Sequence, residues 1–293
     1  MNLKLIKAAA NGYAAQHAAT AARLEFFMPL WEYQDERIKE YAKAISYEVA
    51  DLDAIAAIAR SGKPVFEEAP VAIDADCLVA DAANMAELLC KANQFEISTQ
   101  SLLRDLDWNA AVKAANVELA AAKPAEFLEV LGEVMHRNQI KEAPARVAVL
   151  VTSMALRCQL EAPAAAAVKA LREAKVFLDM HPLTCPVCGS APAMSHVGGE
   201  TSSQGRGRML VCTQCGTNWE FQRVRCACCG QQTPEKLHFF NIEGDDMHRL
   251  AICDGCGGVM RSIFSDEDPL PVAYEVEDVV MTKLNAVAAA SVA

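Results

Sequence analysis

The sequence lacks a long uninterrupted hydrophobic run and lacks an excess of basic residues. Its most apolar stretch, residues 147–156, lies between Arg146 and Arg157 and is far shorter than the roughly 20 residues that a membrane-spanning helix needs. The formal net charge is −11, whereas nucleic-acid binding depends on cationic neutralisation of phosphates. We therefore expect no direct membrane insertion and no nucleic acid as a partner.

Motifs of common catalytic sites are also missing. The sequence contains no serine–histidine–acid arrangement with a nucleophile elbow, and no pair of carboxylates stands out. The glycines of residues 198–207 surround a polar loop without the lysine of a phosphate-binding loop. We therefore predict that the protein is not an enzyme, with no catalytic residues and no residues that bind an organic cofactor.

Residues 1–180 contain no paired cysteines, few glycines and many helix-forming residues. This composition predicts an all-α helical domain of six to eight helices. A continuous amphipathic helix is expected over residues 36–59, ending near Gly62, and a loop over residues 63–76. The first twenty residues are interrupted by polar side chains, so we expect no cleaved signal and a cytoplasmic protein.

Prolines predict three further helices in this domain. A first-turn proline costs no hydrogen bond because the first N–H groups of a helix have no intrahelical partner. Pro124, Pro144 and Pro163 are each followed by apolar residues at helical spacing. We expect each of them to open a helix, the third ending near Asp179.

Eight of the twelve cysteines form four Cys-x-x-Cys-Gly motifs, which we call knuckles. The pairs are Cys185/Cys188, Cys212/Cys215, Cys226/Cys229 and Cys253/Cys256. The first and second pairs are separated by 23 residues, as are the third and fourth, so the unit repeats with an offset of 41 residues. An internal repeat is the simplest account, with the first pair joined to the second and the third to the fourth; an interleaved pairing is the alternative.

The spacing has a chemical reason. Two intervening residues let both sulfurs of a pair reach one ion, and the following glycine adopts the positive φ that the turn requires. A ribbon of about 45 residues cannot bury enough apolar surface to fold alone, so a metal must stabilise it. Such sites accept zinc or iron, and four protein ligands leave no open position for hydrolysis. We predict two metal ions per chain, held by these eight cysteines.

The predicted architecture is α+β and multidomain. An N-terminal all-α domain (1–180) precedes two rubredoxin-like, zinc-ribbon-like modules with four cysteine ligands each (181–222 and 223–270) and a C-terminal strand and helix tail (271–293). Short strands are expected at four places, and a terminal helix from Val276 to about Val287. The expected strands are residues 208–211, 218–224, 238–242 and 250–252.

Several other residues have a functional and a structural interpretation. His196 and His238 follow a knuckle at similar distances, but we expect strand or turn residues because each site already has four sulfurs. Cys228 is expected to point away from the ion, with a ligand-exchanging or redox thiol as the alternative. The remaining cysteines, Cys77, Cys90 and Cys158, are expected in the helical core.

A set of basic and aromatic residues between the knuckles could be a strip on which bases stack. We favour a ribbon strand with alternating exposure, because neighbouring acids cancel the charge. The residues concerned are Arg206, Arg208, Arg223, Arg225, Trp219 and Phe221.

Three cysteine-containing segments resemble the formate dehydrogenase accessory protein FdhE family. These are CPVCGSAP (185–192), RMLVCTQCGTNWEFQRVRCACCG (208–230) and LAICDGCG (250–257). The tail PVAYEVEDVVMTKLN (271–285) is similar to the closing helix of that family, while PLWEYQDE (29–36) and residues 148–160 resemble it in a general way. Cys228 is additional to the four pairs.

The resemblance implies a cytoplasmic, non-enzymatic accessory factor, chaperone-like in character. It would be needed to form active respiratory formate dehydrogenase. Its partner would be the molybdenum- or tungsten-containing catalytic subunit, bound before twin-arginine-dependent export. A homo-oligomer is compatible with this role. The resemblance also favours rubredoxin-type iron in the four-cysteine sites. Two alternatives stay open: a rubredoxin-like iron electron-transfer protein and, more weakly, a zinc-ribbon nucleic-acid-binding protein.

Overall fold

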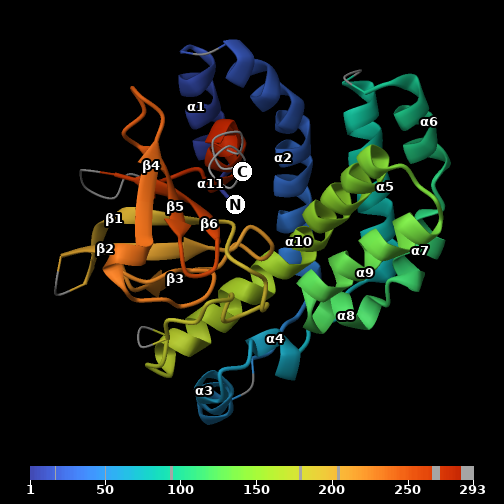
Figure 1. The fold of residues 1–293 in the computed structure, drawn as a ribbon. Coiled ribbons are helices and arrows are strands. Elements are labelled where there is room, and N and C mark those ends of the chain that lie inside the picture. Colours follow the sequence, from blue (N-terminus) through green and yellow to red (C-terminus); the bar gives the residue numbers. More distant parts are fainter. Residues whose placement is uncertain are drawn as a thin grey trace.

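The computed structural model describes residues 1–16, 18–49, 51–92, 95–177, 180–202, 205–265 and 271–284. A helical array is followed in the chain by a six-stranded sheet, and a last helix returns to α1 (Figure 1). The helices of the array are α1 (Leu3–Ala14), α2 (Ala18–Ala44), α3 (Leu52–Ser61), α4 (Val65–Glu68), α5 (Ala75–Lys91), α6 (Ile97–Asp105), α7 (Trp108–Ala114), α8 (Val117–Ala122), α9 (Pro124–Arg137) and α10 (Glu142–Glu173). The fold is therefore α+β, as predicted.

The helical part contains more helices than the predicted six to eight, counted over its described residues. The additional ones are short: α4, α7 and α8 have 4, 7 and 6 residues. Helices this short hardly complete one or two turns, so their apolar residues cannot show a helical period. Helix α4 lies inside the segment that was expected to be a loop.

The prediction of a single helix over residues 36–59 is wrong. Helix α2 ends at Ala44 and α3 begins at Leu52. Asp51 accepts a hydrogen bond from the backbone N–H of Ala54 (2.8 Å) and so caps a new helix. The predicted end is confirmed: Gly62 has φ +77° at the C-cap of α3.

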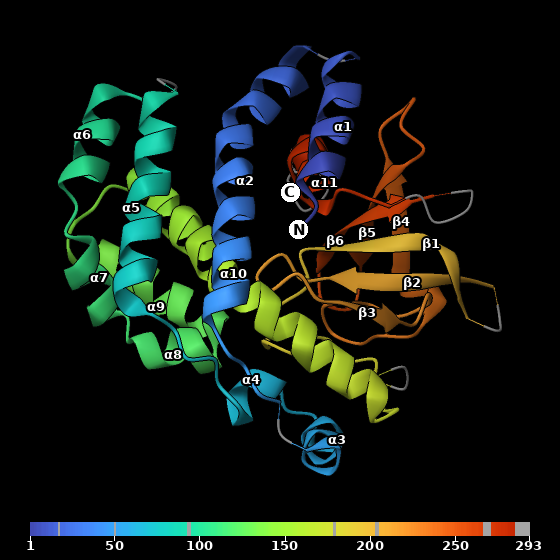
Figure 2. The ribbon, with the colours of Figure 1, turned by 180° about the vertical axis from the view of Figure 1, so that it is seen from behind.

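Helix α10 connects the helical array to the sheet, since its first half contacts α2, α5 and α9 and its last turns run beneath the strands (Figures 1 and 2). Pro124 opens α9 as predicted, and Pro144 lies in the first turn of α10. The prediction of a separate helix from Pro163 to about Asp179 is wrong. Pro163 lies inside α10, and α10 ends at Glu173. Pro163 is buried, and packing on several sides of α10 outweighs the missing N–H.

The six strands form one sheet in the order β3-β2-β1-β6-β5-β4. Their bounds are β1 (Met194–Ser202), β2 (Gly205–Val211), β3 (Asn218–Phe221), β4 (Leu237–Asn241), β5 (His248–Cys253) and β6 (Val259–Phe264). Strands β1–β3 and β4–β6 are two antiparallel meanders, which are joined by parallel pairing of β1 with β6. The predicted strands correspond to β2–β5, whereas β1 and β6 were not expected.

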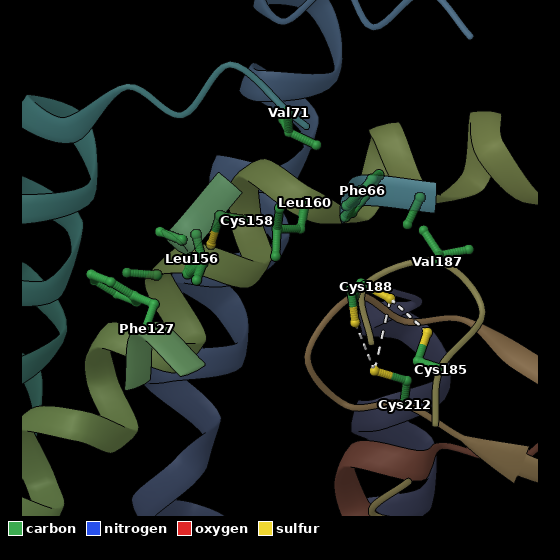
Figure 3. Packing of buried hydrophobic residues seen from close by; sticks show 14 of the residues in the cluster. Phe66, Val71, Phe127, Leu156, Cys158, Leu160, Cys185, Val187, Cys188 and Cys212 are labelled. Atoms are coloured by element: carbon green, nitrogen blue, oxygen red, sulfur yellow. Dashed lines mark hydrogen bonds between the residues drawn. The ribbon is translucent and has the colours of Figure 1, made fainter. Parts of the chain in front are cut away.

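Buried apolar side chains cross the expected boundaries between parts of the chain. One cluster contains Phe127 and Leu156 of the helical array together with Val187 and the four cysteines of the first two knuckles (Figure 3). The boundaries at residues 180, 222 and 270 stay predictions. In the described residues the helical array and the first four-cysteine unit share one core.

The C-terminal segment folds back between α1 and the sheet (Figures 1 and 2). Helix α11 (Tyr274–Val280) is followed by the 3₁₀-helix η2 (Met281–Lys283). Val276 and Val280 pack with Ile6 of α1, and Met281 and Leu284 pack under the strands. The predicted terminal helix is thus present where the chain is described, and residues 285–287 of it lie outside the described residues. No helix of the described segments is long and apolar enough to cross a bilayer.

Candidate metal centres

All four knuckles have the same backbone geometry. In the first one, Gly189 donates its N–H to Cys185 O (2.9 Å) and Cys185 donates its N–H to Ser190 O (2.8 Å). The same two hydrogen bonds recur around Cys212, Cys226 and Cys253 at 2.8–3.0 Å. The glycine of each knuckle has a positive φ, as predicted. The values are +76° at Gly189, +77° at Gly216, +80° at Gly230 and +67° at Gly257.

The first and second knuckles bring four sulfurs together. The Sγ–Sγ distance is 3.6 Å for Cys185–Cys215, 3.6 Å for Cys188–Cys212 and 3.7 Å for Cys212–Cys215. A tetrahedron with metal–sulfur bonds of about 2.3 Å has edges of about 3.8 Å. The four thiols therefore have the spacing of a tetrahedral metal site.

The third and fourth knuckles form a second group. Its Sγ–Sγ distances are 3.9 Å for Cys226–Cys256 and 3.9 Å for Cys229–Cys253. The ligand atoms within each group all lie within 4.8 Å of one another. The sequential pairing is therefore the one that the structure contains, and each group could hold one metal ion.

The two groups differ in exposure. All four cysteines of the first group are buried, whereas Cys229 and Cys256 of the second are exposed. Burial raises the pKa of the Cys185 thiol well above its ordinary value. Four buried thiols lose their protons only when a cation compensates their charge. The first group is suited to a permanent structural ion, and the second lies open to solvent.

Polar groups surround the sulfurs of both sites. Ser190 Oγ lies 3.4 Å from Cys188 Sγ, and Thr217 Oγ1 lies 3.2 Å from Cys215 Sγ. In the second group the backbone N–H of Cys228 donates to Cys226 Sγ and that of Gly258 donates to Cys256 Sγ, both at 3.3 Å. Such donors stabilise thiolates and hold the ligands in place.

Helical elements fix the first site from two sides. Val65 and Phe66 donate their backbone N–H groups to the carbonyls of Pro186 (3.0 Å) and Val187 (2.8 Å). On the other side, Ser153 of α10 donates to Gln214 Oε1 (2.7 Å) in the second knuckle. The first metal centre is consequently held by α4 and α10, a contact that the knuckle spacing did not predict.

The two histidines near the knuckles are not among the clustered ligands. His196 lies in β1, with Nδ1 3.1 Å from Tyr274 Oη and Nε2 3.0 Å from Ser265 Oγ. His238 lies in β4 and pairs with Asp254 (2.7 Å). The interpretation of both as strand residues is confirmed.

The alternative of a base-stacking strip does not fit the structure, because the aromatic residues of the set, Trp219 and Phe221, are buried. Trp219 is fully buried and donates Nε1–H to Pro182 O (3.0 Å). Arg208 is also buried, and its guanidinium lies 5.5 Å from the centre of the Phe221 ring, with that of Arg225 at 5.0 Å. The side chain of Arg206 lies outside the described residues. Arg208 and Arg225 pack within the protein.

The additional cysteines occupy different environments. Cys90 and Cys158 are buried in the helical core as expected, whereas Cys77 is only half-buried. Cys228 is exposed and is not among the clustered ligands. Its side chain lies beside Gly258, where an added Cβ would come within 2.8 Å of the Cys228 sulfur.

A buried polar network was not found from the sequence. His248 of β5 lies between Asp245 (Nδ1–Oδ2, 2.9 Å) and Glu277 of α11 (Nε2–Oε2, 2.8 Å). Tyr13 of α1 donates its hydroxyl to Glu277 Oε1 (2.9 Å). Asp245 and His248 are three residues apart, but Tyr13 and Glu277 come from distant parts of the chain, so no local pattern links all four.

Comparison with known proteins finds similarity around the first four-cysteine group. A sequence model described as "FdhE, central domain" matches residues 184–223, which contain the first two knuckles. The Protein FdhE homolog of Cronobacter sakazakii is 37% identical over 102 residues, 33% of this chain and 31% of that protein. This part of the chain is similar to FdhE proteins.

Further FdhE proteins are similar to this chain. Protein FdhE of Escherichia coli (strain HS) is 37% identical over 86 residues, which are 29% of this chain and 26% of that protein. The matched segments thus span about a third of these FdhE relatives or less. The crystal structure of the FdhE protein from Pseudomonas aeruginosa has a TM-score of 0.50 at 15% identity, covering 99% of this chain and 93% of that chain. The FdhE fold therefore extends over nearly the whole chain.

Proposed function

We propose that this protein is an assembly factor needed to form active respiratory formate dehydrogenase. In this role it binds the molybdenum- or tungsten-containing catalytic subunit in the cytoplasm before export. Similarity to FdhE proteins supports the link to formate dehydrogenase. It acts as a binding protein and not as an enzyme.

The observation that carries the proposal is the shared core of the helical array and the first four-cysteine site. A bound ion would be held by Cys185, Cys188, Cys212 and Cys215, and it would cross-link two knuckles that contact α4 and α10. Such an ion acts on folding, because four protein ligands leave no position for a substrate. The result is a rigid scaffold that presents the second four-cysteine module, including exposed Cys229 and Cys256, to a client.

A deletion strain tests this function. Without the gene, formate dehydrogenase polypeptide is expected to accumulate without activity, and a plasmid copy of the wild-type gene is expected to restore activity. Normal formate dehydrogenase activity in the deletion strain would contradict the proposal.

A second candidate function is electron transfer through iron. The exposure of Cys229 and Cys256 favours it, because an electron-carrying centre must approach its partner's centre. Resemblance to the family favours iron at both sites, and the thiolate ligands themselves accept zinc equally. A preparation loaded only with zinc that fully restores activity to deletion-strain extracts would exclude electron transfer while leaving the assembly function intact. The nucleic-acid alternative is weakened by the burial of Arg208 and Trp219.

A further inference from the structure

Strand β4 leaves one side of its backbone unpaired. It is the last strand of the sheet next to β5 (Figure 1). Asp254 donates its N–H to Lys236 O (2.9 Å), so residue 236 bonds toward β5. Because antiparallel strands bond at every second residue, the N–H and C=O groups of Phe239 and Asn241 face the open edge. The C=O of Leu237 lies on the same side, whereas its N–H donates to Pro234 O. This edge offers a ladder of peptide groups to an added strand.

The internal repeat identifies the edge of β1 that corresponds to the open edge of β4. Met194 of β1 lies opposite Val211, and His238 of β4 lies opposite Ile252, where Val211 and Ile252 each directly precede a knuckle cysteine. Met194 therefore corresponds to His238. By the same register, Ser195, His196 and Val197 correspond to Phe239, Phe240 and Asn241.

In the first repeat, this edge already binds a strand. Residues 195–197 of β1 pair in parallel with residues 262–264 of β6, and Ser265 donates its N–H to Val197 O (3.0 Å). The equivalent edge of β4 has no strand beside it among the described residues. The sheet itself thus shows how a strand of the β6 type would add to β4.

The side chains at the open edge indicate what such a strand contains. Phe239 and Phe240 are 47% and 45% exposed and, as neighbours in a strand, point to opposite faces. An added strand would cover both rings, and removal of apolar surface from water is favourable. Exposed carboxylates flank the edge and favour a cationic partner. They are Glu235, Glu243 and Asp246, which outnumber the exposed Lys236 at the start of β4, while Asp254 pairs with His238.

We propose that the open edge of β4 binds an extended apolar segment, carrying a basic residue, of a partner polypeptide. The segment adds to β4 in parallel, as Val259–Phe264 with its Arg261 adds to β1. Backbone hydrogen bonds provide affinity, and the two phenylalanine rings select apolar residues. The inference deepens the proposed function and rests on it for the partner's identity, the client subunit.

The test uses the purified full chain and a fluorescein-labelled peptide with the sequence of residues 257–265, GGVMRSIFS. Binding is measured by fluorescence anisotropy. Phe239→Pro removes an N–H that faces the open edge and leaves the bonds to β5 in place. Phe239→Val is the matched control, because it also loses the ring but keeps the N–H.

Wild type and Phe239→Val are expected to bind the peptide, and Phe239→Pro is expected to bind it at least about tenfold more weakly. A peptide N-methylated at Ile263 should lose binding to the wild-type chain, since that N–H faces the neighbouring strand in the β1–β6 pairing. A peptide N-methylated at Ser262 should retain it. Replacement of Arg261 in the peptide by glutamate should weaken binding in low salt.

Three results would overturn the inference: no binding to wild type, equal binding to the proline variant and wild type, or equal binding of the two methylated peptides. A dimer of the wild-type chain that Phe239→Pro converts to monomer would make a second copy the occupant, and this also contradicts it. If Phe239→Pro does not fold, the comparison of the two methylated peptides on the wild-type chain still tests the inference. The peptide-binding assay contains no formate dehydrogenase. A negative result would therefore contradict strand addition at β4 without contradicting the assembly function, which the deletion strain tests.

Discussion

The backbone N–H of Phe66 donates to the carbonyl oxygen of Val187 at 2.8 Å. Phe66 belongs to the helical array, and Val187 lies between two cysteines of the first knuckle (Figure 3). Both side chains are fully buried in the same cluster. The geometry of the first metal centre and the packing of the helices consequently depend on each other, whereas the second centre contacts solvent.

The first prediction concerns the stability of the whole chain. Cys185→Ser with Cys188→Ser should lower the free energy of unfolding by at least about 4 kcal/mol, because the ion and its buried ligands are lost together. The thermal transition followed by the circular dichroism of the helices should occur at a lower temperature than in the wild type. The matched double variant Cys229→Ser with Cys256→Ser should change that transition much less, since these ligands are exposed. Equal effects of the two variants would contradict the distinction between the sites.

Metal release should occur in two phases. A chelating dye added to the native protein is expected to take up one metal ion quickly from the exposed second site and another slowly from the buried first site. The Cys229→Ser, Cys256→Ser variant should show the slow phase alone. A single phase releasing both ions in the wild-type protein would refute the prediction.

The glycines that follow the cysteines provide a third prediction. Gly189→Ala and Gly257→Ala each place a side chain at positive φ, +76° and +67°, which costs about 1 kcal/mol. At Gly189 the new Cβ would also lie 3.0 Å from Pro64 Cγ, while at Gly257 nothing lies within 4 Å. Urea unfolding should therefore show a larger loss of stability for Gly189→Ala. A larger loss at Gly257 would mean that the close contact with Pro64 does not matter.

The pH dependence of stability should depend on His248. Burial alone lowers the pKa of His248, but hydrogen bonds and attraction from Glu277 and Asp245 outweigh it and raise the pKa above the ordinary 6.5. The contribution is therefore fully present below about pH 6.5 and is lost as the pH rises through the higher folded pKa. Physically, neutral histidine has one N–H and can donate to only one of the two carboxylates.

The measurement is the thermal midpoint of unfolding between pH 6 and pH 9, with each pKa unit corresponding to about 1.4 kcal/mol. His248→Gln should reduce the fall in stability across this range. The other polar groups that face the network are Tyr13 of α1 and Lys283 of η2, which pairs with Asp245. His238→Gln is the control, because His238 is exposed and pairs with one carboxylate. Parallel pH profiles for wild type and His248→Gln would count against the assignment.

The knuckles could be predicted from the sequence because their determinants are local. Two intervening residues, a following glycine and the 41-residue repeat together specify the turns and the sequential pairing. The extra strands could not be predicted in this way. Strand β1, with the sequence MSHVGGETS, has neither alternation nor an apolar run, and its pairing with β6 joins residues far apart in the chain.

Long-range packing also determines features that the sequence alone does not show. Pro163 was expected to begin a helix, yet it lies in the interior of α10 because that helix is buried on several sides. The alternating exposure expected around Arg208 is confirmed, since Arg208 and Leu210 are buried and Met209 between them is partly exposed. The packing of Arg208 beside the Phe221 ring depends on tertiary contacts that no local pattern shows. At Pro163 tertiary contacts outweigh the local preference.

The most direct test of the assembly function is affinity co-purification from the native host grown with formate, with retained proteins identified by mass spectrometry. The bait is wild type, compared with the Cys185→Ser, Cys188→Ser variant. We predict that wild type retains the formate dehydrogenase catalytic subunit and that the variant, which lacks an intact first metal site, does not. Absence of that subunit from a folded, metal-loaded wild-type bait would contradict the assembly function, and equal recovery with both baits would contradict the role given to the first metal centre.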